Sequence, residues 1–181
     1  MRSTPLYILR LALTLLIITS VVAAALAGVN ALTAPVIASI TAQKTQDAIE
    51  AVLPGGGEAV ESFTDETGLV TAVYASDAGY AIQVAPSGFD GEITMMVGIS
   101  KDGNVLGIDI ISHTETAGLG AVAAAKTSAG VAFRDQFAGQ NGVLAVSKDG
   151  GTIDAITSAT ITSRAVTVGV NAALACAASL G

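Results

Sequence analysis

The sequence predicts an α+β fold in which a single N-terminal transmembrane helix precedes an antiparallel sheet that helices cover. A run of nineteen residues from Leu11 to Val29 carries no charge. Four short segments rich in β-branched residues follow it, and each is separated from the next by a turn that contains glycine or aspartate. Two later segments place apolar residues at helical spacing.

The charge-free run is long enough to cross a membrane, since about 20 apolar residues span the hydrocarbon core. Arg2 and Arg10 precede the run, and acidic residues follow it. Because positive charge collects on the cytoplasmic side, we expect the N-terminus in the cytoplasm and the rest of the chain outside. A cleaved secretory signal is the alternative, because Ala25 and Ala27 offer a small-residue cleavage site. A signal's apolar core is only about 7–15 residues long, which favours a retained anchor.

These patterns divide the chain into three parts. Residues 1–31 are the cytoplasmic N-terminus and the anchor, residues 32–57 are a juxtamembrane helix with a glycine-rich linker, and residues 58–181 are the extracytoplasmic domain. The juxtamembrane helix is expected to start near Pro35, a residue favoured in the first turn of a helix.

Within the domain, alternation and turn signals predict strands over Leu69–Ser76, Tyr80–Pro86, Glu92–Ser100 and Val105–Ser112. The spacing of apolar residues then predicts a helix over Gly120–Ala138, two short strands about the turn Lys148–Gly151, and a last helix over Arg164–Leu180. Met95 and Met96 are neighbours on one strand, so we expect one in the core and the other at the surface or near a cofactor.

Composition excludes several classes of function. After residue 30 the chain holds six basic and fifteen acidic residues, a net charge of −9, which argues against a nucleic-acid partner. Aromatic residues make up 4% with no tryptophan, which supplies poor stacking platforms. The single cysteine, Cys176, excludes an internal disulfide and is expected to be a small buried hydrophobe. The single histidine, His113, excludes a histidine-rich metal site, and we predict no metal ligand and no catalytic residue.

Hydroxyl residues crowd the stretch between a strand ending near Ile156 and the last helix. They are Thr157, Ser158, Thr160, Thr162 and Ser163. Thr162 or Ser163 is expected to cap the helix, but a cap needs one hydroxyl. Because a helix N-terminus also stabilises an anion, a phosphate held here is the other interpretation.

The segment DAITSAT, from Asp154 to Thr160, resembles the flavinylation motif D-x-x-[ST]-G-A-[TS] of FMN-binding domains. The resemblance implies that FMN is joined covalently to Thr160 by a phosphoester. It further implies that Asp154, Thr157 and Ala159 form the frame that a flavin transferase recognises. Ser158 stands where that family has glycine.

A second motif lies in Gly88–Ala121, which is similar to the family's G-[FY]-x-G-x-I strand and H-x-E-T-P-G-L-G loop, with Ala117 in place of the proline. The resemblance implies cofactor contacts from His113, Glu115, Thr116, Gly118, Leu119 and Gly120. Leu119 would lie against the flavin ring. Glu115 would either accept a hydrogen bond from the cofactor or cap the following helix.

With the anchor and the segment Phe133–Gly139, the chain resembles the RnfG component of the Rnf electron transport complex, whose FMN-binding domain is related to one in the sodium-pumping NADH:quinone reductase. This implies an electron-transfer component of an ion-translocating ferredoxin:NAD oxidoreductase in the bacterial inner membrane. The expected partners are the other Rnf subunits and, for maturation, a flavin transferase. The nicotinamide and ferredoxin sites would belong to the partner subunits.

The residues alone leave other functions open. An exported or anchored binding or sensor module would use the hydroxyls only as a cap. A stand-alone extracytoplasmic flavin carrier is the nearest competitor, although no cysteine follows the apolar run to accept a lipid. A hydrolase with a Thr or Ser nucleophile is weaker, because His113 would be its one possible imidazole base and no G-x-S-x-G motif is present.

Overall fold

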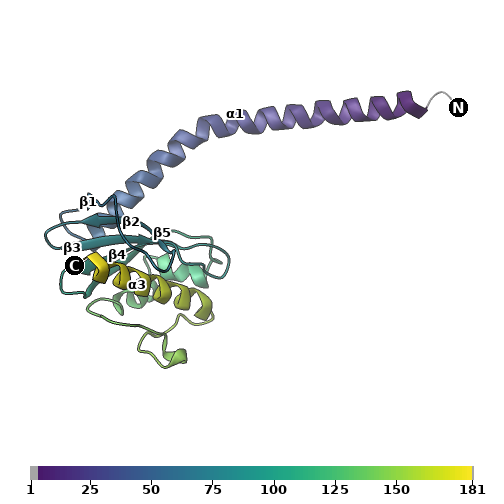
Figure 1. Ribbon diagram of the computed structural model, residues 1–181. Coiled ribbons are helices and arrows are strands. Elements are labelled where there is room, and N and C mark those ends of the chain that lie inside the picture. The colour runs from purple at the N-terminus through teal and green to yellow at the C-terminus, as the bar shows by residue number, and fades with distance from the viewer. Residues whose placement is uncertain (1–3, 181) are drawn as a thin grey trace. The chain divides into compact units, whose positions relative to one another are not determined.

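The computed structural model describes residues 4–180 and shows a long N-terminal helix followed by a five-stranded sheet with helices (Figure 1). The chain forms two compact units, Met1–Gln43 and Lys44–Gly181. Arg2, one of the two arginines from which we predict a cytoplasmic N-terminus, lies outside the described residues.

The N-terminal helix α1 (Thr4–Val52) is continuous over 49 residues. It passes through Pro35, so the prediction that a separate helix starts there is wrong. A proline removes one backbone hydrogen bond, and here the apolar helix formers on both sides continue the helix across it. At about 1.5 Å per residue the helix is roughly 70 Å long, more than twice the hydrocarbon core of about 30 Å.

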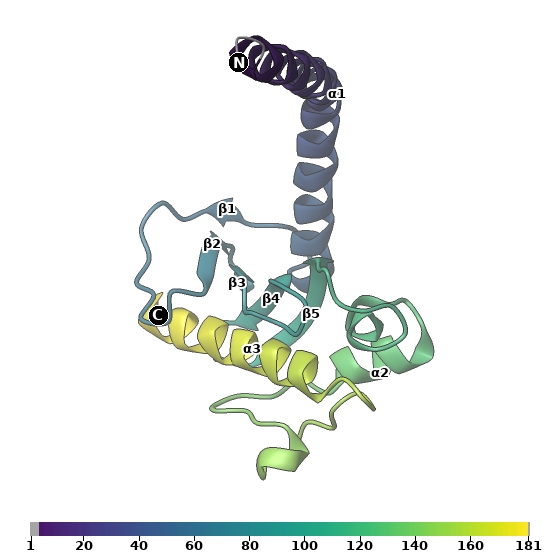
Figure 2. The same cartoon turned by 90° about the vertical axis from the view of Figure 1, so that its right-hand side faces the viewer.

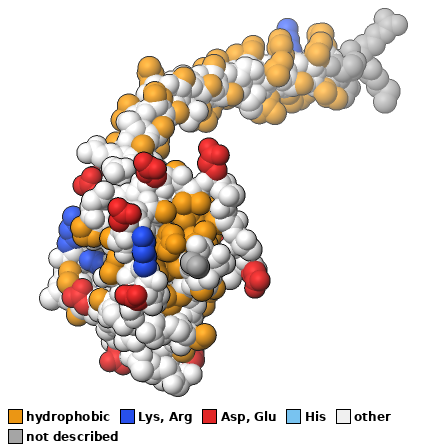
Figure 3. All heavy atoms as spheres, turned by 60° about the vertical axis from the view of Figure 1, so that its left-hand side comes forward, with side chains coloured by type: hydrophobic (Ala, Val, Ile, Leu, Met, Phe, Trp, Pro, Cys, Tyr) orange, Lys and Arg blue, Asp and Glu red, His pale blue; other side chains and the backbone are white. Residues whose placement is uncertain are grey.

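The first part of α1 has the surface of a membrane-spanning helix. Residues 6–43 are exposed, and Figure 3 shows hydrophobic side chains along the helix. Its best window has a mean hydropathy of 2.4. Thr14 and Thr19 donate their hydroxyl hydrogen bonds to carbonyls of the preceding turn, which satisfies these polar groups inside the helix. Helix α3 (Thr160–Leu180) is also long and apolar enough to cross a membrane, but it is mostly buried within the domain.

The sheet is an antiparallel meander in the order β1-β2-β3-β4-β5 (Figure 2). Its strands are β1 (Glu58–Ala59), β2 (Val70–Ala75), β3 (Gly79–Val84), β4 (Thr94–Ser100) and β5 (Val105–Ser112). The four strands predicted from alternation are confirmed to within two residues at each end. The two-residue strand β1 was not predicted.

Helices cover both faces of this sheet. Helix α3 packs on one face, where Met95 joins the larger apolar core. The last turns of α1 pack on the other face, where Ile49, Val52 and Leu53 contact a cluster that includes Met96. Both methionines have no exposed surface, so the prediction that only one of them is in the core is wrong. A strand covered on both sides buries successive side chains.

The segment Gly120–Ala138 is not the single helix that its spacing predicts. A 3₁₀ helix η1 (Gly120–Ala124) and a separate helix α2 (Ser128–Asp135) replace it. The chain is extended at Ala125, and Thr127 caps α2 by accepting a hydrogen bond from the amide of Gly130 at 3.3 Å. Arg134 donates to the carbonyls of Ala123 and Ala125 at 2.6 and 3.1 Å, which satisfies acceptors freed by the break.

The prediction of two short strands about the turn Lys148–Gly151 is also wrong. One isolated parallel bridge joins Val146 to Ile153, and a 3₁₀ helix η2 (Ser147–Asp149) lies between them. The amides of Asp149 and Gly151 donate back to the carbonyl of Val146, at 2.8 and 3.1 Å. These donors are therefore used locally and do not form a strand ladder.

Candidate functional site

A pocket of about 290 Å³ lies at the N-terminal end of α3 and brings the two motifs together. Its lining comes from three segments far apart in the sequence. The lining residues are Phe89, Glu115, Thr116, Leu119, Gly120, Ser158, Ala159, Thr160, Ile161 and Thr162. Of the eleven residues that the two flavin-domain motifs single out, seven therefore line one cavity.

The turn into α3 places Thr160 at this pocket. Ser158 has a φ of +63°, and it is the one non-glycine residue in 4–180 with positive φ. This left-handed conformation is the one that glycine adopts without strain, which gives a physical reason for glycine at the motif position that Ser158 occupies. The helix begins two residues later, with the Thr160 side chain half-buried.

The helix starts four residues earlier than predicted, and the prediction that Thr162 or Ser163 is the N-cap is wrong. Both side chains are buried within the first turn of α3. The Ser163 hydroxyl accepts a hydrogen bond from the amide of Ile156 and donates one to the carbonyl of Ala159, each at 3.0 Å. Ser163 thus closes the turn from inside the helix, and Thr162 bonds to Glu115. Two of the five hydroxyls therefore have structural roles.

Glu115 fastens the three segments to one another. One carboxylate oxygen accepts hydrogen bonds from the amides of Phe89 and Asp90, at 2.8 and 3.1 Å. The other accepts a hydrogen bond from the hydroxyl of Thr162. No side-chain cap is present at η1, so the predicted capping role is wrong, and the two oxygens instead join protein segments, a role that the sequence did not predict.

The surroundings of Glu115 keep its carboxyl ionised. Burial raises its pKa, but the hydrogen bonds from Thr162, Asp90 and Phe89 and the charge of His113 together hold the pKa below its ordinary value. The hydrogen bonds from two amides and a hydroxyl therefore stabilise a negative charge at the wall of the pocket.

Gly120 lets the Glu115 carboxylate and the Thr162 hydroxyl approach each other. A Cβ built on Gly120 would lie 2.2 Å from a Glu115 oxygen and 2.5 Å from the Thr162 hydroxyl. A side chain at this position would therefore separate the loop from α3. Gly118 is different, since it has a φ of +75° and open space around it, so its turn is what requires glycine.

The rim of the pocket is apolar and exposed. Phe89 is 66% exposed, Leu119 is 42% exposed and Ile161 is 50% exposed. Large apolar side chains that gather around one cavity mark a surface that a ligand or partner covers. The pocket therefore has an apolar surface suited to a flat ring, with the Thr160 hydroxyl as a polar group beside it.

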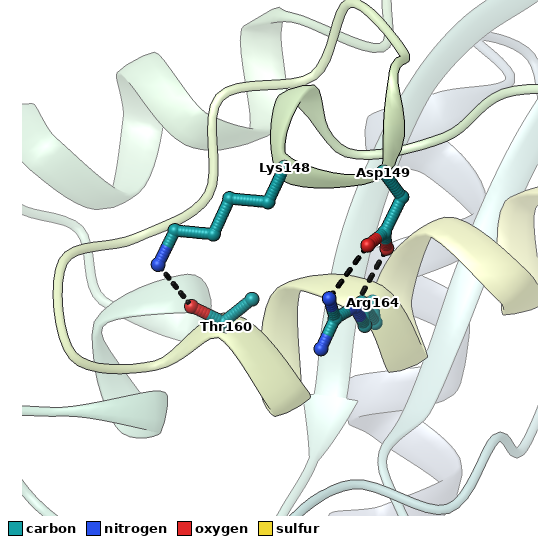
Figure 4. A network of polar contacts seen from close by, with 4 residues as sticks. All are labelled: Lys148, Asp149, Thr160 and Arg164. Carbon is teal, nitrogen blue, oxygen red and sulfur yellow. Dashed lines mark hydrogen bonds and ion pairs between the residues drawn. The ribbon is translucent and has the colours of Figure 1, made fainter.

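A basic residue contacts the Thr160 hydroxyl directly. The Lys148 ammonium donates a hydrogen bond to Thr160 Oγ1 at 3.0 Å (Figure 4). The neighbouring Asp149 forms a bidentate ion pair with Arg164 of α3, with both distances 2.6 Å. Hydrogen bonding and charge from Arg164 hold the pKa of Asp149 below its ordinary value.

The structure separates the remaining predicted residues from this pocket. Asp154, Thr157 and Gly118 line an adjacent groove of about 420 Å³ against α2. The Asp154 carboxylate is exposed, while its backbone is clamped by Gln136 through hydrogen bonds of 2.7 and 3.2 Å. His113 lines neither cavity, and its Nδ1 is buried without a hydrogen-bond partner.

Sequence reasoning did not identify Lys148 or Ile161 as site residues. Lys148 was assigned only to a turn, yet it is one of six basic residues after residue 30 and lies just before the hydroxyl cluster. Ile161 directly follows the motif threonine, but nothing in its type separates it from a core residue.

A larger pocket of about 500 Å³, between the C-terminal half of α3 and the turn at Lys101, contains none of the predicted residues. Cys176 is buried as expected, and burial raises the pKa of its thiol.

Residues 88–175 match the family model of the FMN-binding domain. The chain is 37% identical to the G component of the Na⁺-translocating ferredoxin:NAD⁺ oxidoreductase complex of Acetobacterium woodii, over 91% of this chain and 88% of that protein. It is 43% identical to the G component of an ion-translocating oxidoreductase complex of Vibrio cholerae, over 50% of this chain and 45% of that protein. It is 38% identical to the G component of the proton-translocating ferredoxin:NAD⁺ oxidoreductase complex of Clostridium ljungdahlii, over 56% of this chain and 57% of that protein.

Proposed function

This chain belongs to the RnfG family of ion-translocating oxidoreductase complexes, and from this we propose that it binds FMN and transfers electrons within such a membrane complex. The relative matched along 88% of its length is a subunit of a ferredoxin:NAD⁺ oxidoreductase. The partners are then the membrane and redox subunits of the same complex. An isolated chain carries electrons, and the oxidoreductase activity belongs to the whole assembly.

FMN is attached by a phosphoester to Thr160 in this proposal. The observation that carries it is the position of Thr160, whose side chain lines a cavity where both flavin-domain motifs meet. An apolar rim formed by Phe89, Leu119 and Ile161 suits a flat ring system. The hydroxyl at the start of a helix suits a phosphate.

The protein's own residues hold and orient the cofactor, and the flavin ring, when bound, supplies the ability to accept and donate electrons. Thr160 fixes one end of the cofactor, and Leu119 shields an apolar surface from water. Glu115 positions the pocket walls, because its hydrogen bonds join the Phe89 loop to the first turn of α3 at Thr162. A covalent link retains the cofactor outside the cytoplasm, where free FMN is not supplied.

Asp154 and Thr157 have a different role in this proposal. They line a groove beside the Thr160 pocket, and the Asp154 carboxylate is exposed. This placement suits recognition by a flavin transferase during maturation better than contact with the bound cofactor.

The membrane anchor sets the location of the domain. We assign residues 1–31 to the cytoplasmic end and the single transmembrane segment, residues 32–57 to a juxtamembrane linker, and residues 58–181 to the extracytoplasmic FMN-binding domain. The apolar, exposed surface of α1 supports membrane association. Arg10 on its N-terminal side supports a cytoplasmic N-terminus.

Flavin fluorescence on a denaturing gel tests the proposal. The full chain is co-expressed with a flavin transferase and denatured, and fluorescence is expected to migrate with the wild-type chain and to vanish in Thr160→Ala. Thr152→Ala, which removes an exposed threonine from the preceding loop, serves as the matched control and keeps the fluorescence. A dark wild-type chain, with a transferase that labels a second protein, would favour the binding-module alternative.

A further inference from the structure

We propose that Lys148 is the positioning residue for the flavin phosphoester: its ammonium orients Thr160 Oγ1 for modification and then pairs with the phosphate charge. This inference rests on the proposed attachment of FMN to Thr160. It assigns a role to a residue outside both flavin-domain motifs. Figure 4 shows the Lys148 side chain reaching from η2 to the hydroxyl of Thr160.

The position of Lys148 is fixed from both sides. Asp149, the next residue, is held against α3 by its bidentate pair with Arg164. Before Lys148, the amide of Ser147 donates to the carbonyl of Ile153 at 2.7 Å. Gly150 then ends η2 with a φ of +85°. These restraints hold η2 beside the first turn of α3, so the contact does not depend on the lysine side chain alone.

The charge pattern singles out Lys148 as the cation available to a phosphate. Arg164 is the other basic side chain shown at this turn, and its charge is paired with Asp149. Among the described residues no ion pair involves Lys148. The chain after residue 30 carries a net charge of −9, so an anionic nucleotide is repelled unless a local cation faces it.

A cation at this oxygen stabilises the negative charge that ester formation brings to it. Thr160 Oγ1 attacks the phosphorus of a flavin dinucleotide, so that the Oγ1–P bond forms. The P–O bond to the departing nucleoside monophosphate breaks, and the hydroxyl proton goes to a base of the transferase. The Lys148 ammonium already donates to Oγ1, which leaves the hydroxyl proton free to point toward that base. The product phosphodiester carries one negative charge beside the same ammonium.

Initial rates of flavin incorporation test this role. The full chain in detergent is incubated with a flavin transferase and a flavin dinucleotide, and intact mass follows the adduct. Lys148→Met is expected to lower the initial rate about tenfold, because a charge-assisted hydrogen bond at the reacting oxygen is lost. Lys148→Arg, which keeps the charge, is expected to restore most of the rate. Lys101→Met, in the turn between β4 and β5, is the matched control and is labelled at the wild-type rate.

The outcomes separate this inference from the function on which it rests. If the wild type is labelled and Lys148→Met is labelled equally fast, the inference is wrong and the attachment at Thr160 stands. If Lys148→Arg is as slow as Lys148→Met while both unfold at the wild-type temperature, the role of the charge is wrong. A wild-type chain that stays unlabelled overturns both the attachment and the role of Lys148.

Discussion

At the scale of single residues, the pocket depends on a strained turn and on a buried carboxylate. Ser158 holds a left-handed conformation two residues before α3 begins. Glu115 joins three segments through hydrogen bonds to the amides of Phe89 and Asp90 and to Thr162. Each feature places Thr160 at a cavity, and each can be tested without reference to the flavin.

Replacing Ser158 separates backbone strain from side-chain chemistry. A left-handed conformation costs a non-glycine residue about 1–2 kcal/mol, and glycine loses about 0.5–1 kcal/mol of chain entropy on folding. Ser158→Gly is therefore expected to raise the free energy of unfolding by roughly 0.5 kcal/mol. Ser158→Val, with a β-branched side chain, is expected to lower it by more than about 1 kcal/mol. Urea unfolding followed by the fluorescence of Tyr74 and Tyr80 measures both, and a more stable valine variant would contradict the account.

The lowered pKa of Glu115 predicts how the free energy of unfolding depends on pH. Because its pKa is lowered in the folded state, its contribution is fully present above the unfolded pKa of about 4.3. That contribution is lost as the pH falls through the lower, folded pKa. Glu115→Gln is expected to cost about 1–3 kcal/mol at pH 7, since two amides and a hydroxyl lose an ionised acceptor.

The same unfolding experiment at pH 7 and at pH 4 tests this sign. The difference in stability between wild type and Glu115→Gln is expected to shrink at the lower pH. A difference that grows on acidification would show that the pKa of Glu115 is raised in the folded protein, which would contradict the account.

At the scale of elements, local patterns predicted the strands but not the connections between motifs. Alternation and Asp-Gly turns act over a few residues, so β2 to β5 could be predicted from the sequence. The bond from Glu115 to Thr162 joins residues 47 apart, and the bond from Lys148 to Thr160 joins residues 12 apart. No sequence period encodes such contacts, so the way the loop, η2 and α3 meet could not be predicted.

Two errors in predicting elements also have a tertiary cause. The helical spacing from Gly120 to Ala138 is present, but Thr127 caps a new helix and Arg134 binds the carbonyls at the break. Met96 is buried because the end of α1 covers the second face of the sheet, where one methionine was expected at the surface or near a cofactor. In both cases a contact from outside the segment decided the outcome.

The packing of α1 on the sheet gives a prediction with a built-in control. A Cβ on Gly98 of β4 would lie 2.3 Å from the carbonyl oxygen of Val52, whereas a Cβ on its cross-strand partner Gly107 would meet nothing within 4 Å. Gly98→Ala is expected to lower the free energy of unfolding by about 1–3 kcal/mol, because backbone must move. Gly107→Ala is expected to stay within about 0.5 kcal/mol of wild type. Equal effects in thermal unfolding would mean that α1 does not pack closely on β4.

At the scale of the whole molecule, an apolar anchor is joined to an acidic domain that holds the site. Arg2 and Arg10 precede the apolar run and all fifteen acidic residues follow it, so we expect the N-terminus in the cytoplasm. In the orientation proposed above, the FMN-binding domain works at the outer surface of the membrane with FMN attached to Thr160.

Labelling by a membrane-impermeant maleimide tests the orientation in intact cells. Val143 is 95% exposed, so Val143→Cys is expected to react from outside, whereas the native Cys176 is 3% exposed and its raised pKa keeps it a thiol. Ser3→Cys, before the apolar run, is the cytoplasmic control and is expected to react only after lysis. Reaction of Ser3→Cys in intact cells, with Val143→Cys protected, would reverse the assigned topology.

The most direct test of the central claim is mass spectrometry of the tryptic peptide that contains the motif. Trypsin cleaves after Lys148 and Arg164, which isolates residues 149–164 with all five hydroxyls of the cluster. The chain matured with a flavin transferase is expected to yield this peptide with one FMN added, and fragmentation is expected to place the adduct on Thr160. An adduct on Thr157 or Ser158, or a peptide of unmodified mass from a chain matured under the same conditions, would contradict the account.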